Sequence, residues 1–390
     1  MSETVEQQAV IRSLPLAATH ERLGATIVER EGWRLPAAYE GAAAEYAAVR
    51  DGGAGLIDLS SRGHIEVSGR EAVQFLNGLI TNDVKTLEQG RWMRAAFPNV
   101  QGRLLADARV LRPGDSFLPG DSFLIDTEPA THERVFKTLE RFTLAGDFRV
   151  ADRTSQRVLV SVQGARAAEI VGAVLGAEAM RVEPWRVVTA AWNGQALHLI
   201  RATHTAEDGF DIFVGAGDAG ALWDALSAAG ARPVGCDALE VLRIEAGVPR
   251  HGIDMDETNV VLEAVPGEAV SFTKGCYIGQ EIIARIHWRG HVAKRLAGLG
   301  FDGRAGVLGG DKVRSTDGKE IGRLTSAAFS PRLQRTVALG YVKYDYLAPG
   351  TGVSVLSGDG VEYTAQVTEL PFVRGGWRGT EQQGAEEQQR

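Results

Sequence analysis

The pattern of predicted secondary structure changes at Lys294, and this change constrains the fold more than any other feature. Before Lys294, predicted strands, such as 91–98 and 104–111, are interspersed with amphipathic helical patterns such as 131–144. After Lys294, short strand-like segments alternate with turns rich in Gly, Asp and Pro. The sequence therefore predicts α+β units followed by a small all-β barrel.

Length and apolar content predict more than one hydrophobic core. At 390 residues the chain is too long for one ordinary core, and its apolar fraction of 44% suffices for folding without disulfides. We therefore expect two or three domains. Residues 374–390 are rich in Gly, Gln and Glu and have little to bury, so we expect a disordered tail there.

Composition also argues against several classes of partner. A net charge of −8 disfavours direct binding to a nucleic-acid backbone. Residues 1–10 lack the apolar core of a signal peptide, and no run approaches the ~20 apolar residues that cross a bilayer. Cys236 and Cys276 do not have a zinc-like spacing, and a reducing compartment suits them better than the one disulfide they could form. We expect a soluble, cytoplasmic protein that binds no membrane.

Two common kinds of site have no support. Neither G-x-G-x-x-G nor G-x-x-x-x-G-K-[ST] occurs, so nothing indicates a dinucleotide or nucleoside triphosphate site. His251 lies near Asp254 and Asp256, but no second histidine is suitably spaced, so we expect no metal site.

Residues 274–281, Lys-Gly-Cys-Tyr-Ile-Gly-Gln-Glu, gather a thiol, a cation, a carboxylate and two glycines. Cysteine reacts as the thiolate, and its pKa of about 8.5 falls beside a cation. Lys274 lies two residues before Cys276, so the spacing is compatible with a reactive thiol. Alternatively, Cys276 is a small buried apolar side chain, and Lys274 and Glu281 form a surface pair.

The motif at 274–281 resembles the signature of YgfZ-type folate-binding proteins, which act in iron–sulfur cluster maintenance and, through it, in tRNA modification. Further local matches are similar to the aminomethyltransferase superfamily, which includes the T-protein of the glycine cleavage system. These matches run in order through residues 23–25 with 32–33, 55–60, 81–84, 243–247, and 325–326 with 329–331.

The resemblance implies an α+β fold of three domains, arranged like a clover leaf around a central tetrahydrofolate site. The implied first domain binds folate and comprises residues 1–63 plus 151–240, and the second comprises residues 64–150 plus 241–293 and carries the motif at 274–281. The third is a small C-terminal β-barrel at residues 294–373.

The resemblance also implies a pterin site in residues 201–211, where Glu207 and Asp211 keep the family's carboxylates. One carboxylate can accept the ring N–H and the 2-amino group of a pterin side by side, so Glu207 or Asp211 is the implied partner. His204 replaces a tyrosine of the family and can stack on the pterin or hydrogen-bond to it. Alternatively, residues 207–209 are only a turn before a strand.

In the hairpin after Asn99, T-proteins carry two successive aspartates, one of which works on the folate amine. Here those positions are Ala106 and Asp107, so only the second is retained. Arg243 lies on a predicted helix at 237–247 and could pair with Glu245. The implied catalytic residues are Cys276, Lys274 and Asp107, and the implied folate-binding residues are Glu207, Asp211, His204, Arg243, Tyr277 and Gln280.

Three functions remain open. The first is a tetrahydrofolate-binding accessory protein for iron–sulfur cluster assembly or repair, with Cys276 as its functional thiol and cluster-assembly proteins as partners. The second is a tetrahydrofolate-dependent aminomethyltransferase or demethylase of the T-protein type. The third is a non-catalytic scaffold that binds a protein partner and no folate.

Overall fold

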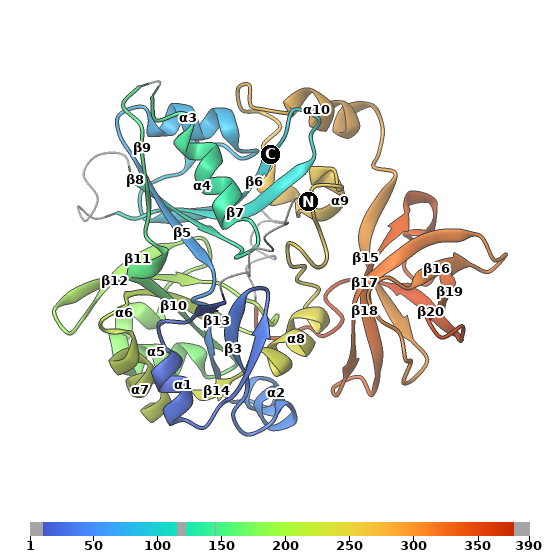
Figure 1. The fold of residues 1–390 in the computed structure, drawn as a ribbon, viewed down its shortest axis with the longest axis horizontal. Helices are drawn as coiled ribbons and strands as arrows, with labels where there is room; N and C mark the ends of the chain where they lie inside the picture. The colour runs from blue at the N-terminus through green and yellow to red at the C-terminus, as the bar shows by residue number, and fades with distance from the viewer. Residues whose placement is uncertain (1–10, 115–121, 145, 378–390) are drawn as a thin grey trace, which may run out of the picture.

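The structure is a computed structural model that describes residues 11–114, 122–144 and 146–377. Figure 1 shows two α+β units, one above the other, with a β-barrel beside them. We call the lower unit in that view the first unit and the upper one the second unit.

A six-stranded sheet forms the centre of the first unit, in the order β11-β12-β13-β10-β4-β14. All its pairings are antiparallel except that of β14 with β4. Its strands are β4 (Gly55–Asp58), β10 (Arg157–Gln163), β11 (Val187–Trp192), β12 (Gln195–Arg201), β13 (Gly209–Gly215) and β14 (Arg232–Val234). Its helices are α1 (Ala17–Arg22), α2 (Ala42–Arg50), α5 (Ala167–Leu175), α6 (Ala177–Met180) and α7 (Ala219–Ala228).

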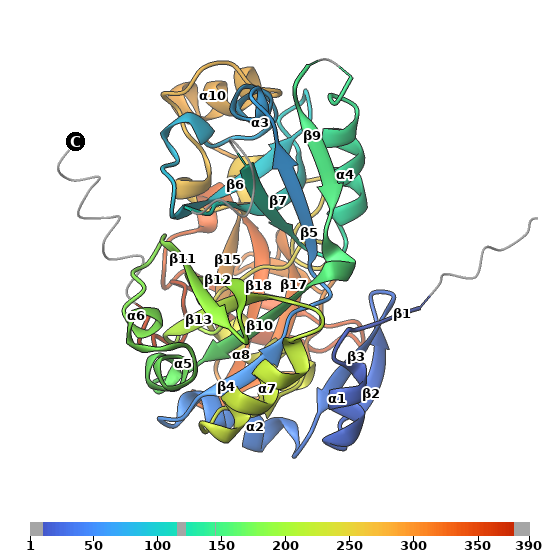
Figure 2. The same cartoon turned by 90° about the vertical axis from the view of Figure 1, so that its left-hand side faces the viewer.

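A small second sheet lies at the edge of the first unit, at the lower right of Figure 2. Its order is β1-β3-β2, with β1 (Arg12–Ser13) parallel to β3 (Trp33–Ala38), and β2 (Thr26–Arg30) antiparallel to β3.

The second unit is built on an antiparallel five-stranded sheet in the order β6-β7-β8-β5-β9. Its strands are β5 (Gly63–Ser68), β6 (Arg91–Pro98), β7 (Leu104–Arg112), β8 (Ser122–Thr127) and β9 (Arg149–Asp152). Helices α3 (Ala72–Leu79) and α4 (His132–Glu140) pack on it, and Leu76, Phe123 and Leu139 are fully buried in the shared core.

The two sheets face each other across an apolar layer. Trp92, Leu111 and Leu124 of the second unit are buried against Leu159 and Phe213 of the first. Strands β10 and β13 are therefore buried on both faces, because helices cover one face and the opposite sheet covers the other. Charged side chains between the sheets have to find partners there, because an unpaired charge in an apolar interior costs several kcal/mol, as an order of magnitude.

The third unit is a closed barrel in the order β15-β18-β17-β16-β19-β20. Its strands are β15 (Lys294–Phe301), β16 (Lys312–Ser315), β17 (Glu320–Ser330), β18 (Arg335–Lys343), β19 (Gly352–Leu356) and β20 (Glu362–Thr368). The remaining helices are α8 (Cys236–Glu245), α9 (Val261–Ala264) and α10 (Gln280–Arg289), with the short 3₁₀ helices η1 (Val84–Thr86), η2 (Thr154–Gln156), η3 (Gly267–Ala269) and η4 (Tyr344–Tyr346).

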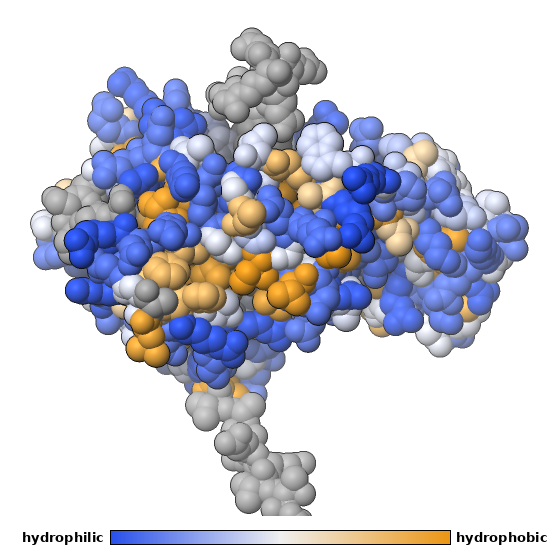
Figure 3. Space-filling view, turned by 90° about the horizontal axis from the view of Figure 1, so that it is seen from above, coloured by the Kyte–Doolittle hydropathy of each residue, from blue (hydrophilic) through white to orange (hydrophobic). Residues whose placement is uncertain are grey.

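The predicted α+β fold with a C-terminal β-barrel is confirmed. The domain boundaries stay predictions, and most of the predicted disordered tail, residues 378–390, lies outside the described residues. None of the helices in the described part is both long and apolar enough to span a membrane. In the view from above, apolar patches gather over the second unit and the barrel surface is mostly hydrophilic (Figure 3).

Arg243 of α8 ties the α+β units to the barrel. Its guanidinium donates to Asp254 at 2.6 Å and to the Ser326 hydroxyl on β17 at 2.7 Å. It also pairs with Glu240, whereas the Glu245 carboxylate accepts from Arg50 at 2.9 Å. The predicted pair of Arg243 with Glu245 is therefore wrong, because Arg243 and Glu245 bind partners in different segments.

Substitution Arg243→Met should destabilise the protein. It leaves the fully buried Asp254 carboxylate without its cation, and breaking a buried pair from one side costs about 3–5 kcal/mol. Chemical denaturation of the variant, beside the exposed control Arg332→Met, measures the loss. Equal unfolding free energies for both variants would contradict this role of Arg243.

Candidate functional site

A chain of buried charges crosses the interface between the two sheets. Arg62 pairs with Asp126 of β8 at 2.8 Å, and Asp126 pairs with Arg109 of β7 at 2.6 Å. Arg109 then reaches across to Asp211 of β13 at 2.5 Å, and Asp211 accepts from the ring Nε2 of His204 at 2.9 Å. We call these five residues the ion chain. It joins the second unit to the first through alternating charges.

Asp211 is fully buried and holds its charge. Burial by itself would raise the pKa of this carboxyl, but His204 and Arg109 beside it lower the pKa well below its usual value. Both carboxylate oxygens already bond to His204 or Arg109. His204 keeps 18% of its side chain exposed, and its Nδ1 bonds to none of the described residues. Asp211 therefore fixes the ring of His204, and the ring presents its free nitrogen.

Asp107 differs from the aspartates of the ion chain. It lies two residues before Arg109 on β7, so both side chains leave the same face of the strand. Its Oδ1 is buried without a hydrogen-bond partner among the described residues, although 32% of the side chain is exposed. Its Oδ1 lies 3.8 Å from Nδ1 of His251, which also lacks a hydrogen-bond partner among the described residues. Asp107 thus has an oxygen free for a ligand.

The environment makes Asp107 a candidate proton acceptor. Burial, helped by the negative charge of Glu128, raises the pKa of Asp107 to about 6, and Arg62 and Arg94 oppose this shift. Burial also lowers the pKa of His251, so its imidazole is neutral at pH 7. A carboxyl group with a pKa near working pH suits general acid–base catalysis.

Glu207 lies in a loop that three parts of the chain hold together. Its Oε1 accepts from Arg50 at 2.9 Å, and the same guanidinium donates to Glu245. Its Oε2 accepts from the backbone N–H of Gly376 at 3.0 Å, and the N–H of Trp377 donates to the Ala206 carbonyl. Only 12% of the Glu207 side chain is exposed, so Glu207 fixes this loop.

Lys274 is turned toward the main chain of the second unit. Its ammonium donates to the carbonyls of Asn77 and Ile80 at 2.8 Å and to that of Asn82 at 2.7 Å. These carbonyls lie at and just beyond the C-terminal end of α3, where helices leave such groups unpaired. All three N–H groups are used, so none is left for the Cys276 thiol.

The other motif residues separate into exposed and buried positions. Cys276 is exposed and free. Tyr277 is buried in a core with Ile283 and Tyr341, its ring lies 4.9 Å from the Lys274 ammonium, and burial raises its pKa to about 12. Gln280 begins α10 after Gly279, whose φ of 77° favours glycine. A Cβ at Gly279 would lie 2.3 Å from the Asn99 carbonyl oxygen, so the hairpin turn and the motif need this glycine.

The structure therefore brings some expected site residues together and keeps others apart. Asp107, Asp211 and His204 lie at the interface of the sheets, whereas Arg243 lies at the barrel and Lys274 at α3. Their roles as catalytic or folate-binding residues stay predictions. Arg50, Arg62, Arg109 and Asp126 were missed, although charged residues inside otherwise apolar strands, as at 107 and 109, are a signal of a buried polar site.

Comparison with known proteins gives one consistent family. Residues 16–274 match the GCVT N-terminal domain, and residues 294–374 match the glycine cleavage T-protein C-terminal barrel domain. An aminomethyltransferase of Saccharopolyspora erythraea is 32% identical over 368 residues, covering 93% of this chain and 98% of the relative. One of Symbiobacterium thermophilum is 33% identical over 376 residues, with coverage of 93% and 98%.

A solved structure shares the whole architecture. The glycine cleavage system aminomethyltransferase T from Bartonella henselae superposes with a TM-score of 0.84 at 27% identity, covering 94% of this chain and 100% of that one. The likeness therefore includes both α+β units and the barrel.

Substitution Lys274→Met should destabilise the protein by about 3 kcal/mol, because it leaves buried carbonyls at the end of α3 without a donor. Burial lowers the pKa of Lys274 from 10.5 to about 8, so the unfolded chain holds this proton more tightly than the folded protein. The wild type should accordingly gain stability relative to the variant as pH rises from about 8 to 10.5.

Denaturant titrations between pH 7 and 10.5 measure both effects. The exposed Lys85→Met variant serves as the control and should unfold like the wild type at every pH. A Lys274→Met variant as stable as this control would show that the three hydrogen bonds contribute nothing.

Proposed function

Since this chain belongs to the glycine cleavage T-protein family of aminomethyltransferases, we propose that it is a tetrahydrofolate-dependent one-carbon transferase. Its donor would be an aminomethyl or methyl compound, and tetrahydrofolate its acceptor. The relatives are named aminomethyltransferases, and they match nearly the full length of the chain. The observation that carries the proposal is the unpartnered Asp107 oxygen between the two sheets.

The unpaired polar groups between the sheets fit a reduced folate. Such a ligand offers N–H donors, and the described residues leave Asp107 Oδ1 free to accept one, with His251 Nδ1 also unpaired beside it. When bound, tetrahydrofolate supplies the amine nitrogens that receive the one-carbon unit. Asp107 would hold the proton of an amine at its carboxylate, because its pKa of about 6 keeps it mostly ionised at neutral pH.

His204 is the proposed direct contact to the pterin ring. Its Nε2 is fixed by Asp211, which leaves Nδ1 to meet the ligand. In this proposal Asp211 is a positioning residue that acts through His204, and Arg109 holds Asp211 in turn. Glu207 orders the adjoining loop through Arg50. The ion chain would then orient the His204 imidazole before any ligand arrives, so ordering this side chain would cost little of the binding free energy.

Substitution Asp107→Asn should lower kcat by about a hundredfold or more, the usual contribution of a general base, and leave tetrahydrofolate binding in place. In the wild type, kcat/KM should fall about tenfold per pH unit below about 6, because protonated Asp107 can no longer accept a proton. The measurement is folate-dependent one-carbon release from an aminomethyl donor.

Asp302→Asn, at an exposed position outside the site, is the matched control and should turn over normally. An Asp107→Asn variant with full activity, or a wild type whose rate is flat from pH 7 to 5, argues against this role for Asp107.

A second function has its own support in exposed Cys276, within the motif at 274–281 that resembles YgfZ-type proteins. In that case the chain would bind tetrahydrofolate and assist iron–sulfur cluster upkeep through this thiol. An exposed thiol can react, whereas a buried one cannot.

Substitution Cys276→Ser separates the two functions. For a transferase built on Asp107, we expect one-carbon release to be unchanged and cluster-dependent enzyme activity to be unaffected in cells lacking the native copy. Loss of cluster-dependent activity in Cys276→Ser, but not in the half-buried control Cys236→Ser, would favour the accessory function. A calorimetric titration with tetrahydrofolate tests the site that both functions share, and absence of binding would reject both.

A further inference from the structure

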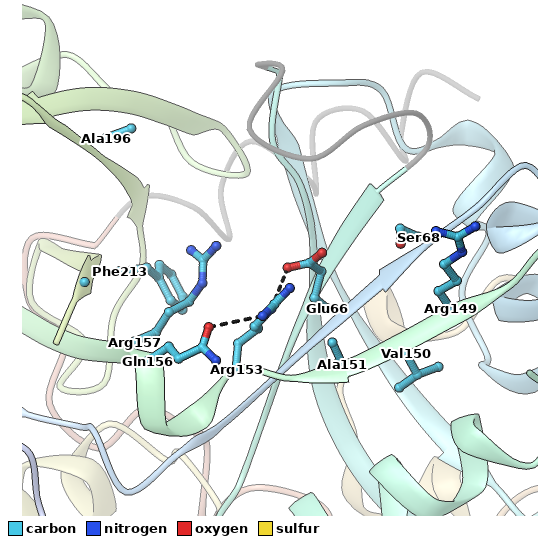
Figure 4. A pocket seen from close by; sticks show the side chains of 11 residues that line it. Glu66, Ser68, Arg149, Val150, Ala151, Arg153, Gln156, Arg157, Ala196 and Phe213 are labelled. Carbon is cyan, nitrogen blue, oxygen red and sulfur yellow. Dashed lines mark hydrogen bonds and ion pairs between the residues drawn. The ribbon is translucent and has the colours of Figure 1, made fainter.

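A hollow lies between the two α+β units, and Asp107 is not among the residues that line it. It has a volume of about 630 Å³ and is lined from β5 and β9 of the second unit and from η2, β10 and β13 of the first (Figure 4). We call it the arginine pocket, because Arg149, Arg153 and Arg157 line it. Its size is in the range of sites for small molecules.

The arginine pocket is positively charged in an acidic protein. Three guanidinium groups face one carboxylate, that of Glu66, whereas the whole chain has a net charge of −8. Glu66 is already bound to Arg153 at 2.9 Å, and Arg153 also donates to Gln156 at 3.1 Å. The lining therefore has positive charge that its own acidic residue does not neutralise.

Arg157 is the unsatisfied member of the arginine pocket. It is half-buried, and its guanidinium makes no hydrogen bond or ion pair with any residue that the structure describes. Burial lowers the pKa of Arg157, the charge of Arg153 adds to this shift, and the charge of Glu66 opposes it. A half-buried cation without a counterion carries a desolvation cost that a bound anion would remove.

The backbone makes room for a ligand beside Arg157. In the sheet, Arg157 of β10 pairs with Gly215 at the end of β13, which has no side chain to fill the space. A Cβ built at Gly215 would meet only an oxygen of Asp218, at 4.0 Å. Figure 4 shows the Arg157 side chain next to Phe213 and pointing into this space, with Arg153 directed to Glu66.

The arginine pocket is separate from the proposed folate site. Asp211 of the ion chain and Gly215 of the arginine pocket lie on the same strand, four residues apart, which is about 13 Å along β13. Phe213 stands between them, with its ring 5.4 Å from that of His64. One small ligand would not reach both sites.

We propose that the arginine pocket binds a small molecule with at least two negative charges, carried as a phosphate group or as a pair of carboxylates, between Arg153 and Arg157. Guanidinium groups bind both kinds of oxyanion in forked pairs. Because the lining comes from both sheets, an anion held there joins the first unit to the second. This proposal does not depend on the one-carbon transferase activity.

The test uses inorganic pyrophosphate and succinate as probes, each titrated calorimetrically into the full chain, with potassium chloride added to hold ionic strength constant. We expect saturable binding of at least one probe to one site. Arg157→Gln should raise Kd at least about tenfold, because it removes a charge-assisted forked pair. Arg157→Lys, which keeps the charge and loses the fork, should give an intermediate Kd.

The exposed variant Arg332→Gln is the matched control and should bind like the wild type. Circular dichroism establishes that each variant is folded, and Arg153→Gln provides a second test if Arg157→Gln does not fold. Binding of pyrophosphate alone identifies a phosphate ligand, and binding of succinate alone a dicarboxylate. Failure of both probes to bind, or equal binding by wild type and the pocket variants, overturns the proposal.

Discussion

The pairing of Arg109 with both Asp126 and Asp211 is the interaction on which the arrangement of the two α+β units depends. Asp126 and Arg109 come from one sheet and Asp211 from the other, and all three are buried. If the sheets shifted relative to each other, a charged side chain would lose its partner inside an apolar layer, at a cost of several kcal/mol, as an order of magnitude. Apolar contacts between the sheets are less selective, since they are not directional.

This constraint also places Asp107. Residues two apart on a strand share a face, so fixing Arg109 against Asp211 fixes the direction of Asp107 toward the same interface. The Arg109 guanidinium donates to the carboxylates of Asp126 and Asp211, and it makes no hydrogen bond to Asp107. The same strand therefore supplies one residue that is locked into the fold and one that keeps an oxygen available. A raised pKa follows from that lack of compensation.

Much of the local structure could be predicted from the sequence, because it follows from short-range patterns. The strand expected at 91–98 is Arg91–Pro98, and the one expected at 104–111 is Leu104–Arg112. The helix expected at 131–144 is shorter, at His132–Glu140, because its amphipathic pattern continues into the turn that follows.

Side-chain partners could not be predicted, because they come from remote segments. Lys274 is near Cys276 in the sequence, yet its ammonium binds carbonyls almost two hundred positions earlier. Arg50 pairs with Glu207 and Glu245, which are distant in the chain, and no local pattern marks it. The resemblance identified Asp107, Asp211 and His204 as candidates, but it gave no indication that Asp211 would be covered by Arg109.

The backbone contacts of Gly376 and Trp377 with the Glu207 loop give the barrel a second attachment to the first unit. From the first unit, α8 leads to the barrel through Arg243, and the segment that follows β20 returns to the loop beside His204. Two attachments leave fewer independent hinges between the first unit and the barrel than a single attachment would. Any tilt of the barrel would therefore be transmitted mechanically to the loop at Glu207, although the barrel itself contributes none of the charges in the ion chain.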